Sequence, residues 1–126
     1  MRIGIVAPAC PLDPVVAEGV RALAAQHHGA ALELVIHPQC YLSEGHFAGP
    51  DDAREDAFVD MANDPTIDAI WFARGGYGSN RFALNALDRL GPSAQSKTYL
   101  GYSDMGFLLA GLSRRGVGRP VHGPMV

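Results

Sequence analysis

Residues 101–104, Gly-Tyr-Ser-Asp, combine a hydroxyl group with a tight turn in a way that suits acyl transfer. They follow a short apolar segment and precede a segment of helical periodicity. A serine on such a sharp strand-to-helix turn is exposed at the edge of a sheet, and the N–H of the next residue can stabilise an oxyanion. We therefore predict that Ser103 is a nucleophile and that the backbone N–H of Asp104 is an oxyanion donor.

The same residues also have a structural interpretation. The hydrolase turn GxSxG has a glycine two residues after the serine, but here Met105 holds that position and Gly106 follows it. Serine is in addition a preferred residue at the N-terminal cap of a helix. Ser103 as a helix cap is therefore the alternative to Ser103 as a nucleophile.

Residues 74–80, Arg-Gly-Gly-Tyr-Gly-Ser-Asn, form a second motif that we call the glycine loop. Its glycines, Gly75, Gly76 and Gly78, let the backbone bend tightly and approach a ligand closely. Their N–H groups can point at an anion. The spacing matches neither a Walker A loop nor GxGxxG, and the loop has no lysine to reach a phosphate. A plain glycine turn followed by Ser79 as a helix cap is the structural alternative.

Short apolar runs alternate along the chain with segments of helical periodicity. We expect strands at residues 3–7, 32–36, 69–73 and 98–102, and the start of a fifth at 120–122. We expect helices that begin at Asp13-Pro14, at Asp51-Asp52, at Ser79 or Asn80, and near Met105. This alternation predicts an α/β fold, an open parallel sheet with helices on both faces in a flavodoxin-like three-layer sandwich.

Helical spacing also predicts how the apolar residues of each helix are arranged. In the first helix the residues that follow this spacing are Val16, Val20, Leu23, Ala24 and His27. The second helix has one apolar face, made of Ala53, Ala57, Phe58 and Met61. In the third we expect Ala83, Ala86, Leu87 and Leu90 to face inward, and the fourth has the i, i+3, i+4, i+7 spacing of Met105, Leu108, Leu109 and Leu112. Trp71 lies inside an apolar strand, so we expect it in the core and not on a stacking surface. Both motifs follow strands, and ligands of open parallel sheets bind beyond the carboxyl ends of the strands.

Composition excludes several classes of protein. The 126 residues suggest one domain, and the net charge of −3 argues against a nucleic-acid-binding surface. Cys10 and Cys40 are too far apart for a CxxC site, so we expect free thiols, no disulfide and no metal site. Free thiols fit a reducing compartment. The chain has no apolar stretch long enough to span a membrane, and we expect a cytoplasmic location.

Four stretches of the chain, in order, resemble the LD-carboxypeptidase family, which includes the microcin-immunity peptidases. They are IGIVAPA at residues 3–9, IDAIWFARGGYGSNR at 67–81, YLGYSD at 99–104 and HGPM at 122–125. The helix start at residues 50–52 also fits. The resemblance spans the whole chain, and four motifs in register are more specific than any one of them.

This resemblance implies a cytoplasmic serine peptidase that removes the terminal D-alanine from murein tetrapeptides by cutting an L,D bond after diaminopimelate. It implies that Ser103 is the nucleophile and that the oxyanion hole uses the N–H groups of Asp104 and Gly76, with Gly75 as the alternative donor. Gly75 and Tyr102 are candidate substrate contacts. The resemblance also implies a homodimer and no metal or organic cofactor.

The family completes its catalytic triad with a Glu and a His from a C-terminal domain that is absent from these residues. A serine hydroxyl without an adjacent base is a weak nucleophile. We therefore expect residues 1–126 to be the N-terminal nucleophile domain and to be essentially inactive alone. His122 follows Ser103 along the chain, but a strand histidine beside Gly-Pro is more typical of a structural residue. The Asp104 side chain should point away from its neighbour Ser103.

Other functions fit parts of the pattern. Within the same family, the alternative is the hydrolysis of peptide-nucleotide antibiotics, as in microcin immunity. In a different class, a flavodoxin-like binding module without catalysis would hold an anion or small molecule on the glycine loop. A signalling receiver domain is disfavoured, because Pro8, Ala9 and Cys10 follow the first strand where a receiver has acidic residues.

Overall fold

Five parallel strands form the centre of the molecule, and the computed structural model describes all residues from Met1 to Val126. The strands are β1 (Arg2–Val6), β2 (Glu33–Ile36), β3 (Ala69–Phe72), β4 (Thr98–Gly101) and β5 (Arg119–His122). Their order in the sheet is β2-β1-β3-β4-β5. From β1 the chain adds β2 on one side and then β3, β4 and β5 on the other. The loops after β1 and β3 therefore flank a topological switch point, where ligands of such sheets bind.

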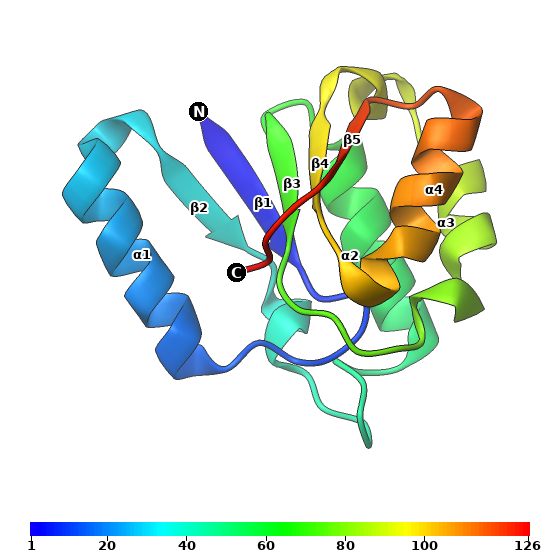
Figure 1. The fold of residues 1–126 in the computed structure, drawn as a ribbon, viewed down its shortest axis with the longest axis horizontal. Helices are drawn as coiled ribbons and strands as arrows, with labels where there is room; N and C mark the ends of the chain where they lie inside the picture. The colour runs from blue at the N-terminus through cyan, green and yellow to red at the C-terminus, as the bar shows by residue number, and fades with distance from the viewer.

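Helices lie on both faces of this sheet, as the alternation of segments predicts. They are α1 (Pro14–His28), α2 (Asp51–Asn63), α3 (Ala83–Asp88) and α4 (Gly106–Arg115). Short 3₁₀ turns connect the elements: η1 (Gly29–Ala31), η2 (Pro38–Tyr41), η3 (Ser79–Arg81), η4 (Pro92–Ser96) and η5 (Ser103–Met105). Figure 1 shows α1 alone on one side of the sheet and α2, α3 and α4 together on the other. None of the helices is long and apolar enough to cross a bilayer.

The helix starts agree with the sequence at α1 but not at α3. Asp13 accepts a hydrogen bond from the N–H of Val15 at 2.8 Å, and Pro14 is the first helical residue. Neither Ser79 nor Asn80 caps α3, because both lie in η3 and α3 begins only at Ala83. The expected helix is delayed since the hydrogen bonds of Ser79 go to another loop, as described below.

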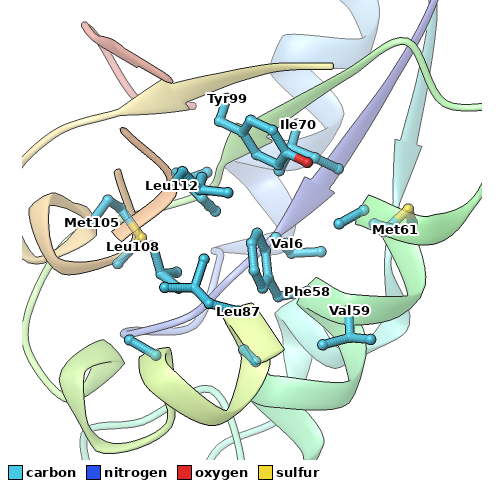
Figure 2. Packing of buried hydrophobic residues seen from close by; sticks show 14 of the residues in the cluster. Val6, Phe58, Val59, Met61, Ile70, Leu87, Tyr99, Met105, Leu108 and Leu112 are labelled. Carbon is cyan, nitrogen blue, oxygen red and sulfur yellow. The ribbon is translucent and has the colours of Figure 1, made fainter. Parts of the chain in front are cut away.

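The larger hydrophobic core lies between the sheet and the helices α2, α3 and α4. It contains 21 buried residues, and Figure 2 shows the packing of part of this cluster around Phe58, Leu108 and Tyr99. The predicted apolar positions of α2, α3 and α4 are buried at Ala57, Phe58, Met61, Ala83, Ala86, Leu87, Met105, Leu108, Leu109 and Leu112, and Leu90 is half-buried against the same core. This packing fixes where the carboxyl ends of β3 and β4 lie.

The residues of helical spacing in α1 are mostly not buried, although Val20, Leu23, Ala24 and His27 line one side of an apolar groove. Only Ala17 of that helix is buried, whereas Val16 and Leu23 are 43% and 56% exposed. The reason is that α1 packs beside the edge strand β2 and leaves an open apolar groove toward the middle of the sheet. Trp71 lies in this groove; it is partly buried against the smaller core, and its Nε1 donates to the carbonyl of Pro124 at 2.8 Å.

Candidate active site

Ser103 is exposed at the carboxyl end of β4, on the turn that leads into α4. Its φ of 59° makes it the one residue other than glycine with a positive φ in the chain. Such a conformation is uncommon for a side chain with a Cβ and concentrates at functional turns. The Ser103 side chain caps neither η5 nor α4, so the alternative role as a helix cap is not observed.

The glycine loop meets Ser103 at the same edge of the sheet. Gly75 is buried, and a Cβ built on it would lie 2.9 Å from the Ser103 Oγ atom and 3.1 Å from the Cε atom of Met125. These distances leave no room for any side chain at residue 75. The two motifs that the sequence places after separate strands are therefore in direct contact, as expected for loops at one edge of a parallel sheet. Figure 1 shows the loop after β3 and the start of α4 at this edge.

Gly76 is exposed, but its backbone also leaves no room for a Cβ. Its φ of 130° favours glycine, and an added Cβ would overlap the Sγ atom of Cys10 from the loop after β1. Sequence reasoning missed both Cys10 and Met125 as neighbours of the site. The available signal was their position, because each follows a strand at the carboxyl edge.

Three backbone amides at this place have no partner inside the chain. The N–H groups of Gly75, Gly76 and Asp104 donate no hydrogen bond to another group of the protein. Gly75 and Asp104 are buried, where backbone amides are otherwise almost always paired, whereas Gly76 is exposed. Unpaired donors beside an exposed hydroxyl are the arrangement that stabilises a developing oxyanion.

The Asp104 side chain connects the two motifs and does not serve Ser103. It is 8% exposed, and its carboxylate accepts the N–H of Ser79 at 2.8 Å. The Asp104 carbonyl accepts the Ser79 hydroxyl at 2.8 Å as well. The prediction that this carboxylate points away from Ser103 therefore agrees with the contacts.

Exposed aromatic rings flank both motifs. Tyr102 is 45% exposed and stands edge-on to the ring of His122 at 6.0 Å between centroids. Tyr77 is 53% exposed and lies 5.6 Å from the rings of both His46 and Phe47. Tyr102, next to Ser103, and Tyr77, in the glycine loop, are therefore exposed rings that a peptide could contact.

No base is hydrogen-bonded to Ser103 within these residues. His122 ends the strand β5, which pairs with β4, and lies beside Gly101 in the sheet. Its imidazole packs against the Tyr102 ring and makes no hydrogen bond to Ser103. The structure thus brings an exposed hydroxyl together with unpaired backbone amides, and a serine hydroxyl without an adjacent base is a weak nucleophile.

Comparison with known proteins gives a consistent result. Residues 3–123 match the family of LD-carboxypeptidase N-terminal domains. The chain is 32% identical to the murein tetrapeptide carboxypeptidase of Pseudomonas aeruginosa over 98% of its own length and 39% of that protein. It is 29% identical to the "Probable murein peptide carboxypeptidase" of Bacillus subtilis, over 98% of this chain and 38% of that protein.

A solved structure supports the fold. The muramoyltetrapeptide carboxypeptidase of Oxalobacter formigenes superimposes with a TM-score of 0.76 at 23% identity, over 99% of this chain and 40% of that one. The chain therefore spans about two fifths of the length of the relatives that it matches.

Proposed function

We propose that this chain, which belongs to the family of LD-carboxypeptidase N-terminal domains, is the nucleophile-bearing domain of a serine carboxypeptidase that acts on murein peptides. The observation that carries the proposal is the contact between the exposed, positive-φ Ser103 and the glycine loop with its unpaired amides. The match to two murein peptide carboxypeptidases over nearly the whole chain supports the substrate class.

In the proposed reaction, the Ser103 Oγ attacks the carbonyl carbon of the last peptide bond of a murein tetrapeptide. The negative charge on the carbonyl oxygen is stabilised by the N–H of Asp104 and that of Gly76, with Gly75 as the alternative donor. The C–N bond breaks, the proton taken from Ser103 passes to the leaving amine, and D-alanine departs. Water then hydrolyses the ester on Ser103 by the same steps.

The proton has to be carried by a base outside these residues. We propose a His, oriented by a Glu, from a C-terminal domain in the longer protein. Residues 1–126 alone should then retain only the weak catalysis of an oxyanion hole without a base. Purified residues 1–126 are expected to release no measurable D-alanine from a murein tetrapeptide. Turnover by this chain alone would contradict that division of roles.

We also propose the setting that the family resemblance implies, a cytoplasmic homodimer that recycles murein fragments without a metal or organic cofactor. Tyr102 and the backbone of Gly75 would line the substrate site. Light scattering of the longest natural polypeptide that contains residues 1–126 tests the dimer.

The decisive experiment labels that longest natural polypeptide with a fluorophosphonate and maps the adduct by mass spectrometry. We expect an adduct on Ser103 that is lost in Ser103→Ala and kept in Ser113→Ala, a matched change at an exposed serine at the end of α4. A folded protein without a Ser103 adduct would contradict the proposal and favour the binding module.

Substrate selection is tested separately on the same protein. Release of D-alanine from a murein tetrapeptide, with no cleavage of a peptide-nucleotide conjugate, is the expected result. The reverse preference would support the microcin-immunity alternative and leave Ser103 as the nucleophile.

A further inference from the structure

Arg54 is a buried cation in the first turns of α2, close to the proposed site but outside it. Its side chain has no exposed surface. Its Nη1 donates to the carbonyls of Pro8 at 2.6 Å and of Gly78 at 3.2 Å, and its Nε donates to the carbonyl of Gly49 at 3.2 Å. Nη2 donates to the carboxylate of Asp51 in the same helix. All three nitrogens of the guanidinium therefore donate hydrogen bonds.

The three carbonyls belong to three separate loops. Pro8 lies after β1, Gly49 lies before α2, and Gly78 belongs to the glycine loop after β3. A guanidinium has five N–H donors in a rigid planar fork, whereas an ammonium group offers three donors from one point. An arginine can therefore fix three loops at once in a way that a lysine of similar length cannot.

Aromatic rings and a close backbone approach hold the guanidinium in place. The Arg54 Cζ atom lies 4.6 Å from the ring centre of Phe47 and 5.2 Å from that of Phe82. Gly78 has a φ of 106°, and a Cβ on it would lie 2.6 Å from the Cε1 atom of Phe47. Only a glycine brings the loop backbone near enough for its carbonyl to reach Arg54.

Stability alone does not explain a charge in this position. Removing a guanidinium from water carries a large desolvation penalty, and well-packed apolar side chains often replace buried ion pairs without loss of stability. Burial lowers the pKa of Arg54, and Asp51 opposes that effect. A buried arginine that is bonded to three loop carbonyls is better explained by the loop geometry that it imposes.

The end of the glycine loop that Arg54 binds is also connected to the neighbour of Ser103 by hydrogen bonds. Gly78 is followed by Ser79, whose N–H and hydroxyl are both bonded to Asp104, the neighbour of Ser103. The unpaired amides of Gly75 and Gly76 lie between this anchored end and β3. Arg54 and Asp104 thus hold the glycine loop from two sides.

We propose that Arg54 is a positioning residue that holds the glycine loop, with its unpaired amides, in the conformation in which it contacts Ser103. The structural part of this inference concerns the loop itself, and its consequence for catalysis rests on the proposed function. Arg54 touches no substrate in this scheme and acts on the glycine loop through its hydrogen bond to the carbonyl of Gly78.

The structural part is tested on the 126-residue chain by nuclear magnetic resonance with Arg54→Lys, which keeps the charge and loses the fork. We expect the amide order parameters of Gly76 and Gly78 to fall from about 0.85 to about 0.6 or lower. Exchange of the Ser79 amide should become at least about tenfold faster. The order parameters of the core strands at Ile70 and Tyr99 should stay unchanged.

A matched control is Arg89→Lys. Arg89 also pairs with carboxylates of α2, Glu55 and Asp56, each at 2.8 Å, but its side chain is 44% exposed and bonds to none of the carbonyls that Arg54 joins. This control should leave the glycine loop unchanged. If Arg54→Lys does not fold, Asp51→Asn replaces it, with a smaller loss of order expected at the same amides. A rigid loop in the folded Arg54 or Asp51 variant, or equal loosening of the whole chain, would overturn the proposal.

The catalytic consequence is measured in the longest natural polypeptide that contains this chain. Arg54→Lys should lower kcat for a murein tetrapeptide by about 10- to 100-fold, since loss of one oxyanion donor costs about 100- to 1,000-fold. KM should change by less than about threefold, because the substrate contacts stay in place. A changed KM with an unchanged kcat would overturn the catalytic part. If the wild type shows neither turnover nor a Ser103 adduct, the proposed function fails, and the loop measurement still decides the role of Arg54.

Discussion

The backbone at Ser103 carries a conformational cost that a helix cap would not need. A residue with a Cβ in the left-handed region costs about 1–2 kcal/mol relative to ordinary conformations. The chain keeps this conformation at one position only, where the hydroxyl is exposed beside the glycine loop. Strain of this kind persists where the surrounding structure imposes it, and it is concentrated at active sites.

This strain leads to a prediction for Ser103→Gly. Glycine accepts a positive φ without a Cβ penalty, although it also gains freedom in the unfolded chain. We expect the variant to be more stable than Ser103→Ala by about 0.5–1 kcal/mol in urea unfolding, while both lose the fluorophosphonate adduct. Equal stability of the two variants would show that the turn is not strained.

The two cysteines should differ sharply in reactivity. Burial raises the pKa of the Cys40 thiol to about 12, and its Sγ donates to the carbonyl of Ile5 at 3.3 Å. Cys10 is partly exposed and lies against Gly76. Iodoacetamide at pH 8 should therefore modify Cys10 and leave Cys40 intact, as read by peptide mass spectrometry.

The modified Cys10 should also block the site, because the added group competes for the space beside Gly76. We expect alkylation to slow fluorophosphonate labelling of Ser103 by about tenfold or more, since small displacements in a site have large effects on rate. Cys10→Ser, treated in the same way, should label at the untreated rate. Unchanged labelling of the alkylated protein would place Cys10 outside the reacting space.

At the scale of single elements, the buried face of α2 contains a charged residue as well as apolar ones. Arg54 has the spacing of the buried positions Ala57, Phe58 and Met61, at i, i+3, i+4 and i+7. The apolar pattern alone suggests Ala53 for that face, yet Ala53 is only partly buried and Arg54 is fully buried. The position of Arg54, a basic residue on the apolar face of a helix, is the sequence feature that could have indicated the proposed positioning role.

A histidine side chain caps the turn η2. The Nδ1 atom of His37 accepts the N–H of Gln39 at 3.1 Å, and burial lowers the pKa of His37. The unfolded value is about 6.5. The stabilising effect of the neutral ring is therefore present above about pH 6.5 and is lost as the pH falls through the lower folded pKa.

His37→Asn tests this dependence, since an asparagine side chain accepts the same N–H and does not titrate. We expect the Tm of the wild type to fall more between pH 7.5 and pH 5 than the Tm of the variant, with similar values at pH 8. Parallel Tm curves for the two proteins would assign the acid sensitivity to other groups.

At the scale of the whole molecule, stability should be uneven between the two faces of the sheet. The α2–α4 side has a core of 21 buried residues, and the α1 side has 7. Helices with few buried apolar contacts open locally at lower free energy than helices in the main core. The site lies on loops that the larger core supports, so opening of α1 should leave the site in place.

Native-state hydrogen exchange measures this difference. Mid-helix amides of α1, such as that of Leu23, should exchange at least about tenfold faster than those of α4, such as that of Leu112. The order parameters of the glycine loop should stay unchanged under conditions in which α1 opens. Equal protection of α1 and α4 would mean that the chain unfolds as one unit.

Local patterns in the sequence determined much of this protein. Strand and helix types, the parallel sheet, the buried faces of α2, α3 and α4, and the pairing of the GYSD and glycine motifs at one edge all follow from short-range periodicity and from strand direction. The motifs were also sufficient to identify the family, which the match over residues 3–123 confirms.

Only the tertiary structure decided features that depend on contacts distant in sequence. The hydrogen bonds of Ser79 to Asp104 delay the start of α3, the edge position of α1 leaves Val16 and Leu23 exposed, and Arg54 is buried because loops from three parts of the chain surround it. A propensity or a periodicity describes neighbours along the chain, whereas each of these outcomes is set by groups more than 20 residues away or by the place of an element in the sheet.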